Sequence, residues 1–288
     1  MNILVTGGNG QLGLSLKKTS GDYPGHTFVF TDLPDADVTD KEAMEALVKS
    51  HSAELIINCA AYTAVDKAES QPEQAEAVNC DGARNMAEIA AEQNIPLIHI
   101  STDYVFNGLS SKPYTEDDLP DPQSVYGRTK LDGELEVGFA RCSAAVVRTS
   151  WLYSEFGHNF VRTMLRLAGD HKPLRIVDDQ TGCPTYATDL ARAVMQLAEN
   201  GIAGFGIYNF CGEGSATWYG FAREIFRQTG LEIPVEAITT AEYPTAAKRP
   251  AYSVLSTEKI RAAGVAVPRW QESLAECLKA LGWGMIDK

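Results

Sequence analysis

The sequence predicts an α/β protein with a doubly wound parallel sheet, on three observations. Short apolar runs, each typical of a buried strand, recur at residues 2–6, 27–31, 54–61, 96–101 and 144–150. Stretches with helical spacing of apolar residues separate these runs, and the longest extends from about residue 72 to residue 94. Glycines or small polar residues follow several runs where the strands should end. This alternation is typical of parallel βαβ units, which bind ligands at the carboxyl ends of their strands.

Composition and charge narrow the class of protein. The 288 residues are 44% hydrophobic and 22% charged, as in soluble globular proteins of one large or two modest domains. No apolar run reaches membrane-spanning length and no basic leader is present, so we interpret the protein as cytoplasmic, without membrane contact. The net charge of −13 argues against nucleic acid as a partner. Six cysteines without a Cys-x-x-Cys pair indicate reduced thiols rather than disulfides or a zinc site.

A glycine-rich segment follows the first expected strand. Residues 6–13 read Thr-Gly-Gly-Asn-Gly-Gln-Leu-Gly and lead into a helix-like stretch. Glycines at such a junction let the backbone approach a ligand, and the helix N-terminus offers N–H groups to a pyrophosphate. A purely structural glycine turn is the alternative. The residues expected to bind a dinucleotide here are Gly7, Gly10, Gln11, Leu12 and Gly13.

An acidic residue ends the second expected strand. Asp32 lies 19 residues beyond Gly13, where a carboxylate usually accepts hydrogen bonds from the adenine ribose. A 2′-phosphate there would meet a like charge, and residues 33–37 contain no arginine, so we predict that NADH is preferred over NADPH. The alternative role for Asp32 is that of a turn residue. Further cofactor contacts are expected from Asp37, Val38, Ala60, Ala61, Tyr62, Thr63 and Ser101.

Tyr126 and Lys130 are the candidate catalytic pair. They are four residues apart on an expected helix and therefore share one face. A phenol ordinarily keeps its proton until a pH of about 10, and a neighbouring cation lowers that pKa, so Tyr126 can transfer a proton near neutrality. An exposed helix turn without chemistry is the alternative. Thr102 follows the fourth strand, where its hydroxyl can donate to the same carbonyl oxygen as Tyr126; Asp103 beside it is a second candidate or a capping carboxylate.

Two neighbouring features are given supporting roles. His99 lies inside an apolar strand, and we interpret it as a core or supporting histidine rather than a base. The stretch from 107 to 123 is rich in Gly, Ser, Pro and Asp, and loops of this length in compact domains are usually functional or mobile. We therefore expect it to cover the substrate.

Motifs extend in order through nearly the whole chain. They lie at residues 6–13, 58–69, 101–106, 126–130, 148–153, 159–165, 179–185 and 249–259. In this order they resemble the extended short-chain dehydrogenase/reductases and, within that family, the dTDP-4-dehydrorhamnose reductases. The segments Ser-Thr-Asp-Tyr-Val-Phe (101–106) and Arg-Thr-Ser-Trp (148–151) are the most specific, because related sugar dehydratases have a glutamate where this chain has Tyr104.

The resemblance implies a Rossmann-type fold of two unequal parts. Residues 1–150 would bind NAD(P)H, with parts of 188–211 returning to that domain, and residues 151–288 would form a smaller C-terminal domain for a nucleotide sugar. For Trp151 a core aromatic is the alternative to a sugar contact, and for Arg249 a surface charge. The residues implied at the substrate are Thr102, Asp103, Trp151, Asn159 and Arg249.

The implied reaction is the reduction of a C4 ketone. NADH or NADPH would deliver hydride to dTDP-4-dehydro-6-deoxy-L-mannose, giving dTDP-L-rhamnose for rhamnose and cell-surface polysaccharide biosynthesis. Tyr126 would protonate the developing alkoxide, and Thr102 would orient the carbonyl and stabilise its negative charge. Lys130 would lower the Tyr126 pKa and hold the nicotinamide ribose. Asp103 is grouped with these three as a catalytic candidate.

Other functions fit the same resemblance. One is a reductase or epimerase of another nucleotide-linked keto sugar, and another is a non-catalytic regulatory subunit like the partner of methionine adenosyltransferase. The complete set of Thr102, Tyr126 and Lys130 favours an enzyme. Some members of the family dimerise around magnesium through a glutamate that this chain replaces with Ser15, so we assign no metal. A homodimer is compatible with the resemblance, and the oligomeric state stays open.

Overall fold

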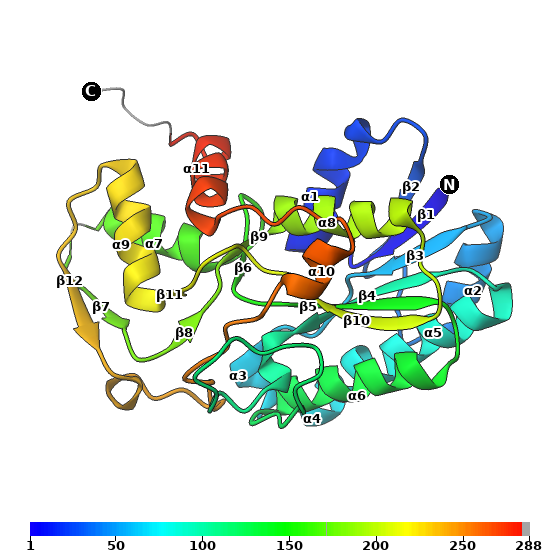
Figure 1. The fold of residues 1–288 in the computed structure, drawn as a ribbon, viewed down its shortest axis with the longest axis horizontal. Helices are drawn as coiled ribbons and strands as arrows, with labels where there is room; N and C mark the ends of the chain where they lie inside the picture. The colour runs from blue at the N-terminus through cyan, green and yellow to red at the C-terminus, as the bar shows by residue number, and fades with distance from the viewer. Residues whose placement is uncertain (171, 284–288) are drawn as a thin grey trace.

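A six-stranded parallel sheet forms the centre of the computed structural model, which describes residues 1–170 and 172–283 (Figure 1). The strand order is β10-β5-β4-β3-β1-β2, and every neighbouring pair is parallel. The chain places β2 on one side of β1 and β3 on the other, which is the reversal that defines a doubly wound sheet. The predicted fold class is therefore confirmed. The six strands are β1 (Asn2–Thr6), β2 (Thr27–Phe30), β3 (Leu55–Asn58), β4 (Leu97–Thr102), β5 (Ala144–Thr149) and β10 (Phe205–Asn209).

Helices cover both faces of this sheet. Because its inner strands are buried on both sides, neighbouring residues of β1 serve different cores: Ile3 and Val5 face one helical layer and Leu4 faces the other. This two-sided burial explains why the strands read as continuous apolar runs in the sequence. One layer consists of α1 (Gln11–Thr19) and α8 (Ala187–Asn200), and the other of α2 (Lys41–Ser50), α5 (Gly82–Gln93) and α6 (Val125–Phe139).

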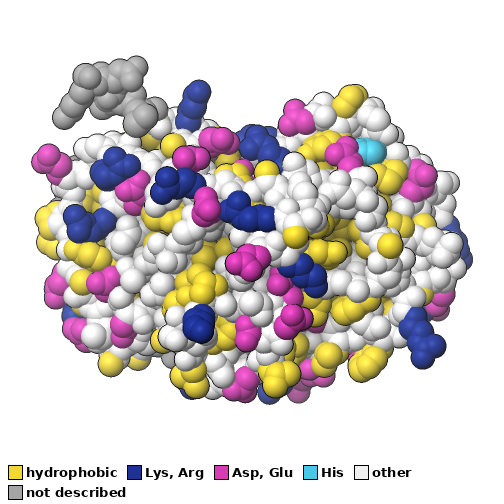
Figure 2. All heavy atoms as spheres, in the orientation of Figure 1, with side chains coloured by type: hydrophobic (Ala, Val, Ile, Leu, Met, Phe, Trp, Pro, Cys, Tyr) yellow, Lys and Arg dark blue, Asp and Glu magenta, His cyan; other side chains and the backbone are white. Residues whose placement is uncertain are grey.

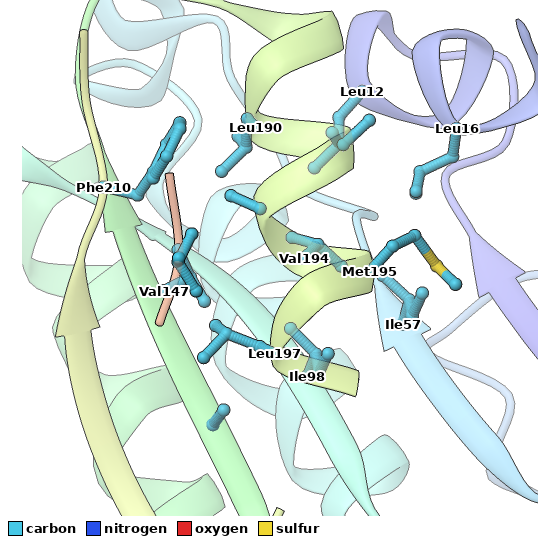
Figure 3. Close-up of a cluster of buried hydrophobic side chains, with 14 of the residues drawn as sticks. Leu12, Leu16, Ile57, Ile98, Val147, Leu190, Val194, Met195, Leu197 and Phe210 are labelled. Carbon is cyan, nitrogen blue, oxygen red and sulfur yellow. The ribbon is translucent and has the colours of Figure 1, made fainter. Parts of the chain in front are cut away.

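The core under α1 and α8 anchors a late segment of the chain to the sheet. Burying one Leu or Val side chain stabilises a fold by about 1.5–3 kcal/mol, so several such contacts hold α8 firmly. β10 follows α8 and pairs with β5 from Phe205 to Asn209. Figure 3 shows the side chains that meet in this core, among them Leu12, Leu16, Ile57, Ile98, Val147, Leu190, Val194 and Met195.

The long helix expected over 72–94 is one continuous helical run with a wider turn inside it. α4 (Pro72–Glu76) passes into a π-helical turn at Ala77–Asp81 and then into α5. The turn places Asn79 so that its side chain bonds both backbone groups of Tyr62, accepting from the N–H at 2.8 Å and donating to the carbonyl at 3.2 Å. Single π turns frequently occur at functional sites, and this one holds the loop that follows β3.

A smaller part of the chain has its own aromatic core, built around Tyr153, Tyr186, Phe221 and Trp270. It lies at the left of Figure 1. Its helices are α7 (Phe160–Ala168), α9 (Trp218–Thr229) and α11 (Trp270–Ala280). Its paired short strands are β6 (Leu152–Tyr153) with β9 (Thr185–Tyr186), β7 (Leu174–Val177) with β12 (Val235–Ile238), and β8 (Thr181–Gly182) with β11 (Ala216–Thr217).

One more segment returns to the sheet late in the chain. α10 (Glu258–Ala262) contributes Ile260 to the core under α8, together with Val265 and Val267. The sequence does not predict this return, because these apolar residues stand among polar and small ones without a clear period. The division of the chain at residue 150 stays a prediction. The remaining short helical elements are α3 (Val65–Ala68) and the single turns Ser20–Asp22, Asp103–Val105 and Thr240–Glu242.

The surface mixes charges of both signs. On the face drawn in Figure 2, Lys and Arg side chains lie among Asp and Glu side chains. Within residues 1–170 and 172–283, no helix is long and apolar enough to cross a membrane. The six cysteines are free thiols, of which Cys59 alone is partly exposed.

Candidate active site

A cavity of about 900 Å³ lies at the carboxyl ends of the sheet strands. Its walls come from the ends of β1, β3, β4 and β5 and from the smaller part of the chain. The volume is near the upper end of the range of about 300–1,000 Å³ that is typical of small-molecule pockets. Every residue that the sequence analysis assigned to catalysis, cofactor or substrate lines this cavity.

The glycine-rich segment forms a close-packed floor under one end of the cavity. Gly7 has a φ of +65°, and a Cβ there would lie 2.7 Å from the backbone nitrogen of Ala60. A Cβ on Gly13 would lie 2.4 Å from the Gly7 carbonyl oxygen, so α1 can start this close to β1 only with glycine. No side chain caps α1 at Gly10. The first N–H groups of the helix are therefore available to an anion.

Two carboxylates lie at the same end of the cavity. Asp32 accepts from the N–H of Asn9 at 2.7 Å through Oδ2 and from the N–H of Leu33 at 2.8 Å through Oδ1. Asp37 accepts from the N–H and the hydroxyl of Thr39 at 2.9 and 2.8 Å. Each carboxylate oxygen can accept more than one hydrogen bond, so both side chains retain capacity toward the cavity.

Helix α6 presents Tyr126 and Lys130 to the cavity. The Ser124 hydroxyl begins the helix by accepting from the Gly127 N–H at 3.1 Å. A Cβ on Gly127 would lie 2.2 Å from the Tyr104 carbonyl oxygen, which shows how closely the first turn approaches the end of β4. The rings of Tyr104 and Tyr126 meet edge to face with centroids 5.5 Å apart. These contacts fix the position of the Tyr126 side chain.

The pKa of Tyr126 departs from the expectation. Burial raises this pKa above its ordinary value, Asp103 and Tyr104 add to the rise, and the Thr102 hydroxyl acts against it. Lys130 is not among the groups that shift it, so the predicted lowering by Lys130 is not met in this structure. Loss of water around the phenol dominates this pKa, and the Lys130 ammonium donates elsewhere, to the Ile100 carbonyl. The raised pKa keeps Tyr126 protonated at neutral pH, which is the form that a proton donor needs.

The other partners of Lys130 belong to β4. Its Nζ donates to the Ile100 carbonyl at 2.7 Å and lies 3.3 Å from Nε2 of His99. Burial lowers the pKa of Lys130 to about 8. The Ala60 N–H donates to Oδ1 of Asn58 at 3.2 Å, which turns the Asn58 Nδ2 toward Nδ1 of His99 at 3.1 Å. Burial, together with the Lys130 cation, lowers the pKa of His99 well below its ordinary value, so this ring is neutral.

Asp103 is buried beside the catalytic candidates. Its Oδ1 accepts from the Thr102 hydroxyl at 3.1 Å. Burial raises the pKa of Asp103 to about 6, although the hydroxyls of Ser253 and Thr102 favour the charged form. Burial thus disfavours the charged form of the Asp103 carboxylate.

We predict that Asp103→Asn removes a pH-dependent loss of stability. Because the pKa of Asp103 is raised to about 6 in the folded state, the folded protein keeps this proton longer than the unfolded chain does. The free energy of unfolding therefore falls as pH rises from about 4 to about 6, by about 3 kcal/mol for a shift of about two units. Denaturant unfolding at both ends of this pH range should show a smaller decline in the variant. Equal declines in the parent and the variant would contradict this account of Asp103.

Trp151, the predicted sugar contact, is stacked on a second indole. The ring centroids of Trp151 and Trp218 are 3.5 Å apart and the rings are inclined by 5°. Trp151 has a φ of +46°, and a Cβ on Gly182 would lie 2.5 Å from its ring. Trp218 begins α9 and donates from Nε1 to Gln180 at 3.1 Å. A sugar reaches the stacked face of Trp151 only after Trp218 moves.

The other two substrate candidates already have partners within the protein. Asn159 donates from Nδ2 to Gln11 Oε1 at 2.9 Å and accepts from the Arg162 N–H at 3.2 Å, which caps α7. Arg249 donates to the Tyr104 hydroxyl at 3.1 Å and to Asp66 at 2.9 Å. The alternative role for Arg249, that of a plain surface charge, does not fit these two hydrogen bonds. Contacts of Asn159 and Arg249 with the substrate stay predictions.

The loop over 107–123 does not cover the cavity, contrary to the expectation. None of its residues lines the cavity wall. The Tyr114 ring stacks on Phe106 with centroids 4.2 Å apart, and Glu116 accepts from the Asn209 N–H at 2.7 Å. These contacts tie the loop to the segment that follows β4 and to the last residue of β10, so it lies beside the cavity wall rather than over it.

The comparison with known families decides the relationship. A family model described as "RmlD substrate binding domain" matches residues 1–282. The chain belongs to this family. The resemblance inferred from the motifs is therefore confirmed.

Relatives in this family are similar to this chain over nearly its full length. A dTDP-4-dehydrorhamnose reductase of Sinorhizobium fredii is 43% identical, with 98% of each chain covered, and one of Aggregatibacter actinomycetemcomitans is 44% identical, with 94% of this chain and 96% of the relative covered. The crystal structure of the dTDP-4-dehydrorhamnose reductase of Clostridium acetobutylicum is 41% identical with a TM-score of 0.93, covering 98% of this chain and 100% of that one. The Bacillus anthracis reductase in complex with NADP is 35% identical with a TM-score of 0.92, covering 97% and 99%.

In the part of the chain that the structure describes, no group of three or more His, Cys, Asp or Glu side chains is arranged to hold a metal ion. Ser15, at the position where some family members have glutamate, is buried and donates to the Gln11 carbonyl at 2.8 Å.

Proposed function

We propose that this protein is a dTDP-4-dehydrorhamnose reductase. It reduces the C4 ketone of dTDP-4-dehydro-6-deoxy-L-mannose with NAD(P)H and forms dTDP-L-rhamnose, for rhamnose and cell-surface polysaccharide biosynthesis in the cytoplasm. The observation that carries the proposal is that Thr102, Tyr126 and Lys130 line one cavity with the glycine floor. The relatives named dTDP-4-dehydrorhamnose reductase support the choice of substrate.

The residues of this chain fit a nicotinamide dinucleotide. The floor at Gly7 and Gly13 leaves no room for a Cβ, and the uncapped N-terminus of α1 suits a pyrophosphate. Asp32 and Asp37 would hold the adenosine end, and Lys130 the nicotinamide ribose. When bound, the cofactor supplies the hydride. The NADP complex of the Bacillus anthracis relative supports this class of cofactor.

Tyr126 performs the acid step. The neutral phenol donates its proton to the C4 oxygen as negative charge develops there, and the Thr102 hydroxyl donates a hydrogen bond to the same oxygen. The raised pKa of Tyr126 ensures that the proton is present before the reaction. The raised pKa also makes the phenol a weak acid, so the proton transfer depends on the negative charge that develops on the C4 oxygen.

Turnover with the proposed substrate tests the function. The purified protein is supplied with dTDP-4-dehydro-6-deoxy-L-mannose, NAD(P)H oxidation is followed, and the product is identified. Formation of dTDP-L-rhamnose supports the proposal, whereas a different sugar product would indicate another keto-sugar reductase or epimerase. A protein that binds NAD(P)H without oxidising it would fit the regulatory-subunit alternative. A homodimer stays a prediction, which sedimentation equilibrium tests.

We predict that kcat/KM is higher with NADH than with NADPH and that Asp32→Ala narrows this difference. The 2′-phosphate of NADPH would meet the Asp32 carboxylate, and Asp37 lines the same end of the cavity. Among the described residues of the cavity wall, the only Lys and Arg side chains are Lys130 and Arg249, which belong to the opposite end. Like charges in a partly desolvated crevice oppose binding.

The measurement is kcat/KM for both cofactors at low, fixed ionic strength, in the parent and in Asp32→Ala. Lys17→Ala, an exposed change on α1, serves as the control for added or lost charge. A clear preference for NADPH in the parent, or an unchanged ratio in Asp32→Ala, would reduce Asp32 to a turn residue.

A further inference from the structure

The side chain of Gln11 joins the glycine-rich floor to the smaller part of the chain. Its Oε1 accepts from the Ser154 hydroxyl at 2.9 Å and from Nδ2 of Asn159 at 2.9 Å. Its Nε2 lies 3.5 Å from the Leu152 carbonyl. A Cβ on Gly157 would lie 3.4 Å from the Gln11 Cγ, so the two segments lie close together. One side chain of the floor thus has three partners across the cavity.

A second tie lies further along the same helix. Lys18 is seven residues, about two turns, beyond Gln11 and therefore on the same face of α1. Its Nζ donates to Glu155 Oε1 at 2.5 Å and to the Tyr186 hydroxyl at 3.3 Å. The Tyr186 hydroxyl donates in turn to Glu155 Oε2 at 3.0 Å. Both ties end on the stretch from residue 152 to residue 159.

This stretch forms the wall of the cavity on the side of the smaller part. Leu152, Gly157, His158 and Asn159 all line the cavity. Asn159 also begins α7, because its Oδ1 accepts from the Arg162 N–H. A ligand that contacts this wall and a ligand that contacts the first turn of α1 therefore share Gln11 as a common neighbour.

We propose that Gln11 is a positioning residue that couples the two ligand sites, so that a bound dinucleotide raises the affinity for the nucleotide sugar and the reverse. The inference rests on the proposed function. An anion held by the N–H groups at the start of α1 fixes the backbone of Gln11 and with it the side chain that orders residues 152–159. The second ligand then binds to residues 152–159 when these are already ordered, so its binding free energy no longer includes the cost of ordering them. Coupling between sites is reciprocal, and a factor of about ten lies within the usual range.

Binding measurements test the coupling without turnover. Calorimetry gives the Kd of NADH and of dTDP, each alone and with the other saturating, for the parent, Gln11→Met and Lys17→Met. Methionine keeps the length of the side chain and removes its hydrogen bonds, while Lys17 is exposed on the same helix. In the parent and Lys17→Met each ligand should tighten the other about tenfold, and in Gln11→Met by less than about threefold.

The outcomes separate this inference from the proposed function. If NADH and dTDP bind the parent independently, or if Gln11→Met couples them as strongly as the parent does, the coupling is overturned while the function stands. If NADH does not bind the parent, both are overturned. Should Gln11→Met fail to fold, Ser154→Ala removes one partner of Gln11 from the other side, and the coupling factor should fall there as well.

Discussion

Tyr126→Phe is expected to lower kcat by about 10²–10⁴-fold while the protein still binds NADH. The change removes one oxygen and the transferable proton, and it leaves the ring that packs edge to face on Tyr104 at 5.5 Å. The phenol lines the cavity beside Thr102, so the change is confined to the proposed site of proton transfer. The measurement is kcat and KM in the direction of ketone reduction, with the NADH Kd determined separately.

Tyr243→Phe is the matched control, because Tyr243 is 59% exposed and lies outside the cavity wall. It should turn over like the parent. A kcat for Tyr126→Phe within a few-fold of the parent value would remove Tyr126 from the acid role and leave Thr102 as the next candidate.

Lys130→Met is expected to weaken NADH binding and to lower kcat, because Lys130 is proposed both to hold the nicotinamide ribose and to assist Tyr126. The loss of a charge-assisted hydrogen bond to the ribose corresponds to about 1.5–3 kcal/mol, or about 10–150-fold in the Kd of NADH. The change also leaves the Ile100 carbonyl and Nε2 of His99 without their partner, so the Tm should fall. The measurements are the Kd of NADH, kcat and the Tm.

Lys112→Met, a change of an exposed lysine outside the cavity wall, provides the control for loss of positive charge. An NADH affinity in Lys130→Met equal to that of the parent, in a protein that remains folded, would refute the ribose contact. The fall in NADH affinity reports the contact with the ribose, and the fall in the Tm of the free protein reports the lost hydrogen bonds to Ile100 and His99.

The sheet and the cofactor end of the cavity were predictable because their signals are local. The strands of a parallel sheet are buried on both faces, so they read as apolar runs such as residues 2–6 and 96–101. The glycines at positions 7 and 13 are required by backbone contacts within one strand–helix junction. Tyr126 and Lys130 share a helix face because of their spacing alone.

The features that the sequence did not reveal depend on contacts between distant segments. Trp218 stacks on Trp151 only because β8 and β11 pair, and nothing near Trp218 in the sequence marks it as a wall of the cavity. The pKa of Tyr126 rises rather than falls because folding removes water from around the phenol. Lys130 instead contacts the Ile100 carbonyl and His99. Burial of this kind cannot be read from the spacing of two residues.

The loop over 107–123 is a segment whose role was wrongly predicted because its contacts with distant segments cannot be read from its composition. Its composition indicates a functional loop, yet the contacts of Tyr114 with Phe106 and of Glu116 with Asn209 hold it away from the cavity. Composition predicts that a segment is a loop, and tertiary contacts decide what the loop covers.

The central claim is that hydride reaches C4 of the sugar while Tyr126 supplies the proton to the C4 oxygen. The most direct test uses NADH labelled with deuterium at its transferable position, dTDP-4-dehydro-6-deoxy-L-mannose, and nuclear magnetic resonance of the product. The parent should form dTDP-L-rhamnose with deuterium at C4, and Tyr126→Phe should form the same product far more slowly. Product without deuterium at C4, deuterium at another carbon, or no product from a protein that binds both ligands would contradict the account.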